Sequence, residues 1–361
     1  MIPIADPDIR APERRRVQRV LESGQLAAGP EVTAFEEEFA AHCDAPEAIA
    51  TANGTAALHA ALVALGIGPG DTVLTTPFSF IASANAARLA GADVVFADID
   101  SRTFNLDPAA VEEQLRADEP IDAVIAVHLF GLPADVDRLL ELRDRYDFAL
   151  VEDAAQAHGA TVNGETVGTF GDAACFSFYP TKNVAAGEGG MITTDRPDVA
   201  ARARRFIDHG RTARYEHAEV GHNLRMSSVH AAIGRAQLER LDTAIEARRH
   251  NAEQLTDLLD QHGIETPVEP AGRRHAYHQY TIRHPDRDRL RESLADRGVQ
   301  TGVYYPIPIH EQPAYDDVSD KFPSAERAAE EVLSLPVHPT VSTEDIDHIH
   351  RSMIRTLEVT R

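Results

Sequence analysis

Short apolar runs of strand length alternate with stretches of helical periodicity over the first two thirds of the chain. The runs at 72–76, 92–97 and 123–129 are dominated by apolar residues and are too short to be typical helices. Between them, the stretch 136–144 places its apolar residues at three- and four-residue spacing, on one helical face. This alternation predicts an α/β fold, with a mainly parallel sheet sandwiched by helices. Further strands are expected at 149–152, 173–178 and 191–194, further helices at 12–23, 31–42, 81–89, 108–116 and up to 208, and a strand, turn and helix over 48–65.

The pattern changes near residue 240, where the regular alternation ends. A long helical region is expected to begin in the stretch 221–228 and to continue through Arg249. Beyond it, two or three helices mix with strand-like segments such as 278–283, which is an α+β pattern. We therefore predict a large domain over residues 1–240, with a lead-in over 1–30, and a smaller C-terminal α+β domain over 241–361.

Chemically useful side chains follow several of the predicted strands. Asp153, Ser177 and Lys182 fall at or just beyond strand ends, which is where sites form in parallel sheets. Gly54 and Thr55 begin an alanine-rich helix, so backbone N–H groups and the Thr55 hydroxyl could bind an anion there. A plain helix cap is an equally good interpretation of that turn.

Lysine is almost absent from this chain, and that makes Lys182 conspicuous. Lys182 and Lys321 are the only lysines among 35 basic residues. Lys182 lies between two apolar runs and ahead of a glycine-rich turn at 187–190. Arginine cannot replace an amine that must lose its proton to attack a carbonyl, because the pKa of arginine is too high. A lone lysine is usually a solvated surface charge, but these flanks favour a Schiff base between Lys182 and an aldehyde cofactor.

The formal net charge of −23 argues against binding of nucleic acid or of an anionic membrane surface. An acidic surface that keeps arginine and avoids lysine is typical of halophilic proteins, although an ordinary acidic protein is the alternative. Cys43 and Cys175 lack metal-ligand spacing, so no metal is expected. The chain shows neither a signal peptide nor an apolar stretch long enough to span a membrane, so a cytoplasmic enzyme is expected.

Several ordered motifs together resemble the DegT/DnrJ/EryC1/StrS family of sugar aminotransferases, which are fold-type I enzymes dependent on pyridoxal 5'-phosphate. The resemblance runs nearly end to end and is more specific than any one motif. It covers 23–30, 53–58, 127–131, 152–159, 171–190, 223–226, 305–310 and 335–339.

The resemblance implies roles for residues around the cofactor. Lys182 would form the Schiff base and later move the proton between substrate and cofactor carbons. Asp153 would pair with the protonated pyridine nitrogen, although a cap at the strand end is its alternative role. Gln156 would contact the ring hydroxyl. Phe80 would stack on the ring, with a simple core phenylalanine as the alternative. The phosphate would be bound by Gly54, Thr55 and Ser177.

The same resemblance implies a substrate side and a second subunit. Asn223 would reach the phosphate of the neighbouring subunit, which implies a homodimer with shared active sites. A nucleotide diphosphate needs cations, and with so little lysine these would be arginines. The expected substrate-side residues are His158, Tyr305, His310, Arg211 and Arg225, with Arg214 as a further candidate for the diphosphate.

The implied reaction moves an amino group from glutamate or glutamine to the keto group of a nucleotide-linked deoxysugar, in amino sugar biosynthesis. A branch of the family that catalyses dehydration has histidine in place of the lysine, so Lys182 favours the aminotransferase. A PLP-dependent dehydratase or lyase is the first alternative, and a PLP-binding regulator is the second. The family more often has serine where this chain has Asn53, but the following Gly-Thr pair is kept.

Overall fold

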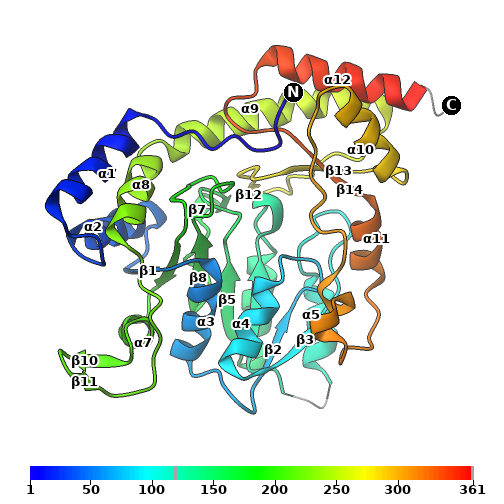
Figure 1. Cartoon of the computed structure of the whole chain (residues 1–361). Helices are drawn as coiled ribbons and strands as arrows, with labels where there is room; N and C mark the ends of the chain where they lie inside the picture. Colours follow the sequence, from blue (N-terminus) through cyan, green and yellow to red (C-terminus); the bar gives the residue numbers. More distant parts are fainter. Residues whose placement is uncertain (118–119, 359–361) are drawn as a thin grey trace.

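The computed structural model describes residues 1–117 and 120–358, and its centre is a seven-stranded sheet (Figure 1). All of its strands are parallel except β9, which runs antiparallel to both neighbours. This arrangement confirms the predicted mainly parallel sheet. In spatial order the strands are β1 (Glu47–Thr51), β9 (Gly190–Thr194), β8 (Ala173–Ser177), β5 (Ala149–Asp153), β4 (Ala123–Val127), β2 (Thr72–Thr75) and β3 (Asp93–Phe96).

Helices cover both faces of the sheet because successive strand residues point to opposite sides. In β8, Ala173 and Cys175 pack into one core, whereas Ala174 and Phe176 pack into another. The first face is covered by α3 (Gly54–Leu65), α4 (Ala82–Ala90) and α7 (Pro197–Ile207). The second is covered by α2 (Pro30–Cys43), α5 (Pro108–Leu115), α6 (Val136–Tyr146) and α8 (Ser228–Leu238).

The C-terminal part builds a separate core beside the sheet. Strands β13 (Tyr280–Arg283) and β14 (Val332–Leu335) pair antiparallel, and α9 (Leu241–Leu259), α10 (Arg287–Asp296) and α12 (Thr343–Glu358) pack around them. Ile2, at the start of the chain, joins the same core, and Figure 1 shows the two termini near each other at this end.

Two features cross the boundary expected near residue 240. Helix α11 (Pro323–Glu331) and Tyr315 pack back into the core beside the sheet. Residues after the boundary therefore contribute to the hydrophobic cores of both parts. The helical region predicted to run unbroken through Arg249 is interrupted at Arg240, where the backbone leaves helical geometry with φ −120° and ψ 9°. The two-domain division itself stays a prediction.

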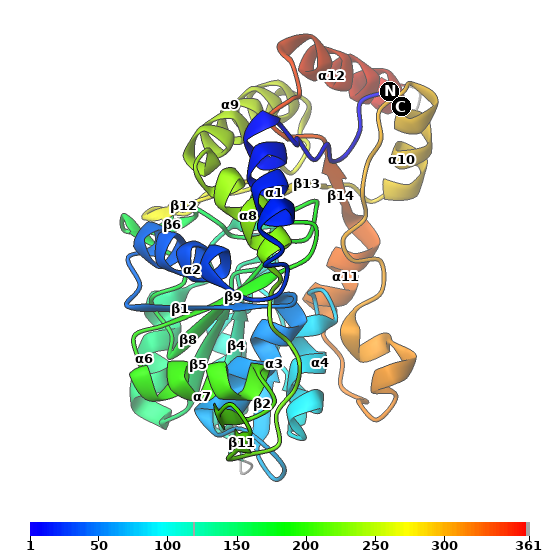
Figure 2. The same cartoon turned by 60° about the vertical axis from the view of Figure 1, so that its left-hand side comes forward.

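Smaller elements complete the chain. Helix α1 (Ala11–Ser23) packs along α8, and both lie on the same side of the molecule in Figure 2. A hairpin of β10 (Arg211–Ala213) and β11 (Glu216–His217) extends from the body beside α7 (Figure 1). In the described ranges, no helix combines the length and the apolarity that crossing a membrane requires. The remaining elements are β6 (Thr161–Val162), β7 (Glu165–Thr166), β12 (Arg273–Arg274) and the short 3₁₀ turns η1 (Leu129–Gly131), η2 (Asp260–His262), η3 (Ile309–Glu311) and η4 (Pro313–Tyr315).

Candidate active site

The carboxyl ends of the parallel strands open into a cavity of about 870 Å³, a size typical of small-molecule sites. Strand β5 contributes Asp153, β8 contributes Ser177, and the loop after β8 contributes Lys182. The helix α3 adds its first residues, Gly54 and Thr55. The structure therefore brings together groups that are far apart in sequence.

The start of α3 forms a cradle for an anion. Asn53 caps the helix, because its side-chain oxygen accepts a hydrogen bond from the Ala56 N–H at 2.9 Å. Within the described residues, the N–H groups of Gly54 and Thr55 have no protein partner, as is general for a first helical turn. Gly54 approaches Ser177 so closely that a Cβ on it would lie 2.8 Å from the Ser177 Cβ. The cap interpretation of this turn is confirmed, and because Gly54 and Thr55 line the cavity, anion binding there stays a prediction.

Asp153 is a buried carboxylate, 5% exposed, at the end of β5. Ser83 donates to its Oδ2 at 2.7 Å, and the Ala155 N–H donates to its Oδ1 at 3.2 Å. Burial raises the pKa of Asp153 above its ordinary value, against these hydrogen bonds and the positive charge of Lys182. A cation placed against this carboxylate would keep it ionised. The bond to Ala155 closes a local turn at the strand end, but no helix begins there, so the helix-cap alternative is wrong. The contact with the ring nitrogen stays a prediction.

Lys182 lies on the connection between β8 and β9, as the sequence indicates. Its own backbone N–H is held by the Tyr179 carbonyl at 2.9 Å. Burial lowers the pKa of Lys182 to about 8, and the Asp153 carboxylate opposes that shift. A substantial fraction of the side chain is therefore the neutral amine at neutral to mildly alkaline pH, which is the form that attacks a carbonyl.

Gln156, Tyr305 and Phe80 line the cavity opposite the cradle. The Gln156 Nε2 donates to the Tyr305 hydroxyl at 3.0 Å, and its Oε1 accepts from the Phe130 N–H at 2.7 Å. Phe80 is 57% exposed, so it is not the simple core residue of the alternative interpretation. Its ring lies 6.1 Å from the Tyr305 ring, centroid to centroid.

Two predicted substrate-side histidines lie outside the cavity wall. His158 is 1% exposed and packs between Phe176 and Phe178, and burial lowers its pKa to about 3. His310 is 5% exposed and its Nε2 lies 3.3 Å from Glu326. Both rings lie in the packed interior beside apolar residues. Neither histidine can contact a substrate directly in this arrangement.

Asn223, expected to reach a neighbouring subunit, and the arginines expected at the substrate diphosphate also lie outside this cavity. Leu224 faces the cavity, whereas its neighbours Asn223 and Arg225 do not line it, as expected from the alternation of an extended chain. Arg225 forms an ion pair with Asp208, and Arg211 lies 3.4 Å from the same carboxylate. Arg214 sits over the Tyr215 ring in the exposed hairpin. Within one chain, none of these four side chains lines the cavity that contains Lys182.

The cavity also contains residues that sequence reasoning did not select. Tyr179 and Tyr304 line it; Tyr179 lies inside the motif 171–190, and Tyr304 directly precedes the motif 305–310. His278 and Gln279 line it from the segment before β13. Nothing in the local pattern around that segment signals a site, because its position depends on how the C-terminal part folds back.

A buried pair supports this edge of the sheet. Glu152 is fully buried and accepts hydrogen bonds from the N–H groups of Gly168, Phe170 and Gly171 at 2.8–3.0 Å. His128 lies 3.0 Å from the same carboxylate. Although burial opposes it, the bond to His128 lowers the pKa of Glu152. The pair ties the ends of β4 and β5 to the loop before β8 and so fixes the strand from which the cavity carboxylate extends.

These residues fit a phosphate-bearing aldehyde with a basic ring nitrogen, which is the chemistry of pyridoxal phosphate. Free N–H groups at a helix start suit the phosphate. Among the described residues, the Asp153 carboxylate has no ion pair, which suits the ring nitrogen, and a partly neutral amine suits the aldehyde. The fit rests on the donors present and on their burial.

Comparisons with known proteins agree with this geometry. The profile of the DegT/DnrJ/EryC1/StrS aminotransferase family matches residues 7–354. The chain is 42% identical over 346 residues to a pleiotropic regulatory protein of Geobacillus stearothermophilus, covering 94% of this chain and 92% of the relative. It is 40% identical over 331 residues to UDP-2-acetamido-2-deoxy-3-oxo-D-glucuronate aminotransferase of Pseudomonas aeruginosa, covering 91% and 92%. The crystal structure of S. venezuelae DesV in complex with a ketimine intermediate superposes with a TM-score of 0.95, at 37% identity and 98% coverage of both chains.

Proposed function

We propose a nucleotide-linked keto sugar as the substrate of this chain, which belongs to the DegT/DnrJ/EryC1/StrS aminotransferase family. The chain is accordingly a sugar aminotransferase of fold type I. The proposal rests on one observation: Lys182, Asp153 and the first residues of α3 line the same cavity. The proposed amino donor is glutamate or glutamine.

Each residue of the wall has a physical task in this reaction. Pyridoxal phosphate, when bound, supplies a ring that accepts the electrons released at the substrate carbon. Lys182 would hold it covalently through Nζ, and its free amine would then move a proton to and from the substrate carbon. Asp153 would hold the proton on the ring nitrogen. Gly54, Thr55 and Ser177 would bind the phosphate, and Phe80 would cover the ring.

Lys182 also separates this proposal from its two alternatives. A dehydratase of this family has histidine at that position. We therefore expect a product that carries a new amino group, and not one that has lost oxygen. The name of one relative, a pleiotropic regulatory protein, matches the regulator alternative. A regulator, however, has no use for a proton-transferring amine in a cavity of substrate size. An amino sugar as product would distinguish transamination from both.

A panel of nucleotide keto-sugars tests the substrate class. The protein is first converted to its amine-bearing form with glutamate, and return of the aldehyde absorbance is then followed with each sugar. We expect at least one nucleotide keto-sugar to restore that absorbance, and we expect the matching free keto-sugar to be much slower, because it lacks the diphosphate.

The same assay tests the arginines. Arg211→Gln, Arg214→Gln or Arg225→Gln should raise KM for the nucleotide sugar while the half-reaction with glutamate stays nearly intact. Arg116→Gln is the matched control, because Arg116 lies at the end of α5, outside the cavity and the hairpin. Restoration by simple keto acids alone, with every nucleotide sugar inert, would remove the chain from sugar chemistry.

A shared active site is the second proposal, and Asn223 tests it. Asn223 is exposed and directed away from its own cavity, which supports a role in the cavity of a neighbouring subunit. Asn223→Ala should therefore weaken cofactor retention several-fold without lowering thermal stability. Mixed with inactive Lys182→Ala chains, inactive Asn223 variants should regain some activity through hybrid dimers. A fully active monomer in sedimentation experiments would contradict shared sites.

A further inference from the structure

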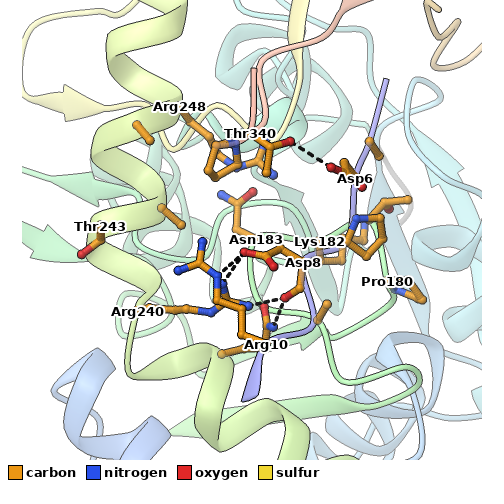
Figure 3. Close-up of a pocket in the computed structure, with 18 residues that line it drawn as sticks. Asp6, Asp8, Arg10, Pro180, Lys182, Asn183, Arg240, Thr243, Arg248 and Thr340 are labelled. Atoms are coloured by element: carbon orange, nitrogen blue, oxygen red, sulfur yellow. Dashed lines mark hydrogen bonds and ion pairs between the residues drawn. The ribbon is translucent and has the colours of Figure 1, made fainter. Parts of the chain in front are cut away.

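A second cavity, of about 220 Å³, lies against the segment that carries Lys182 (Figure 3). It shares only Thr181 and Lys182 with the main cavity, so these two residues border both. Its other walls come from the N-terminal segment 5–10, from α8 and α9, and from residues 339–340. None of the groups assigned to the phosphate or to the ring lines it.

Most of the charge in this cavity is already compensated. Asp8 forms ion pairs with both Arg10 and Arg240, the latter at 2.8 Å. Arg240 also pairs with the buried Glu13 at 2.8 Å. Asp6 is exposed at the edge, where Thr340 donates to it at 3.0 Å. These groups hold the N-terminal segment in place. The other charged side chains that line the cavity are Lys182, which the proposed function assigns to the cofactor, and Arg248.

Arg248 is different because it is buried without an acidic partner. It is 7% exposed, and its Nη1 donates only to the backbone carbonyls of Tyr277 and His278, at 3.1 and 3.4 Å. Its Nε has no partner, and among the described residues no carboxylate lies within ion-pair distance of it. An unpaired buried guanidinium lowers the stability of the fold. Its position beside a cavity therefore indicates that the cavity binds an anion.

Asn183 supplies a second unsatisfied group to the same cavity. It is 7% exposed, and its Nδ2 donates to the Ala276 carbonyl at 3.1 Å. That bond fixes the orientation of the amide and leaves Oδ1 as a buried acceptor without a partner. Apart from Lys182, which borders both cavities, the cavity thus presents one unpaired cation, Arg248, and one unpaired acceptor, Asn183 Oδ1 (Figure 3).

We propose that this cavity binds a small carboxylate that also carries a hydrogen-bond donor. The carboxylate would lie on Arg248, whose planar guanidinium matches two carboxylate oxygens, and the donor would lie on Asn183 Oδ1. A singly charged group suits one unpaired guanidinium better than a phosphate, because Asp6 and Asp8 line the same space. The volume exceeds the roughly 150 Å³ that accommodates benzene in a protein interior, so several non-hydrogen atoms fit.

Lactate and propionate form a matched pair of test ligands, because they differ only by the hydroxyl group that would donate to Asn183. Each is titrated into the purified full-length chain without cofactor or sugar, and binding is followed by ligand-detected NMR. We expect saturable lactate binding and propionate binding weaker by several-fold, the effect of one lost hydrogen bond. The measurement does not depend on the proposed substrate, because no reaction takes place.

Variants locate the binding. Arg248→Met should weaken lactate binding by about tenfold or more. Arg249→Met is the matched control, because Arg249 also donates to a backbone carbonyl, that of His275, yet lies outside the cavity. If Arg248→Met fails to fold, Ala247→Met gives the same test, because it fills the cavity and leaves the guanidinium in place.

The main cavity is the competing location, and Ser177→Ala reports on it. Loss of lactate binding in Ser177→Ala, with binding retained in Arg248→Met or Ala247→Met, would place the ligand in the phosphate cradle and overturn the proposal. Absence of saturable lactate binding by the unaltered chain would overturn it as well, as would equal binding of propionate and lactate.

Discussion

Lys182→Ala is expected to lower turnover by about 10⁴-fold or more, the upper range for loss of a positioned proton-transfer group. The side chain has no substitute nearby, because the chain has only one other lysine, Lys321, whose side chain is 72% exposed and directed at Glu326. The expected loss should appear in kcat, measured as amino sugar formed. The fold should survive, because the backbone N–H of residue 182 can still donate its hydrogen bond to the Tyr179 carbonyl.

Lys321→Ala is the matched control and should retain full activity. The chemical state of Lys182 gives a second, independent measurement. In a Lys321→Arg background without cofactor, Lys182 is the only side-chain amine, and peptide mapping separates it from the N-terminus. Burial lowers its pKa to about 8, so acylation should increase as pH rises and reach half its maximum near pH 8. Full activity of Lys182→Ala would be incompatible with the proposed role.

The sheet could be predicted from the sequence because its strands are short, apolar and separated by periodic helices. The local pattern alone determines which residues of each strand are buried, and the strands of the sheet agree with that pattern. The interruption at Arg240 could not be predicted in this way. Its backbone turns where the side chain reaches Asp8 and Glu13, contacts that exist only once the N-terminal segment lies against α8.

The residues of the candidate site also fall into two groups, those that the local pattern places and those that depend on contacts between distant segments. Asp153, Ser177 and Lys182 follow strands, so the rule that parallel strands end at one edge brings them together. His278 and Arg248 reach their cavities from the C-terminal part, and no rule about strand ends places them. His158 shows the opposite failure: its motif suggests a contact with substrate, yet packing against Phe176 and Phe178 buries it.

Asp153→Asn should lower activity by about 10²–10³-fold, comparable to removing one preorganised electrostatic contact from an active site. Asparagine keeps the size of the side chain, its single oxygen can still accept from the Ala155 N–H, and its amide nitrogen can donate to the Ser83 hydroxyl oxygen, so the fold should be unchanged. What it removes is the negative charge that would hold a proton on the ring nitrogen. Burial makes that charge difficult to replace, because few groups reach a side chain that is 5% exposed.

The pH dependence separates a charge effect from a structural one. The pKa of Asp153 is raised by burial, so the free protein should lose the negative charge as pH falls through a range above the ordinary aspartate value. Cofactor affinity should therefore fall with decreasing pH in the unaltered protein, and this part of the pH dependence should be absent in Asp153→Asn. Ser83→Ala is the control, because it removes one hydrogen bond from the carboxylate but keeps the charge, and it should cost much less activity. If Ser83→Ala and Asp153→Asn lost activity equally, orientation of the side chain rather than its charge would account for the role of Asp153.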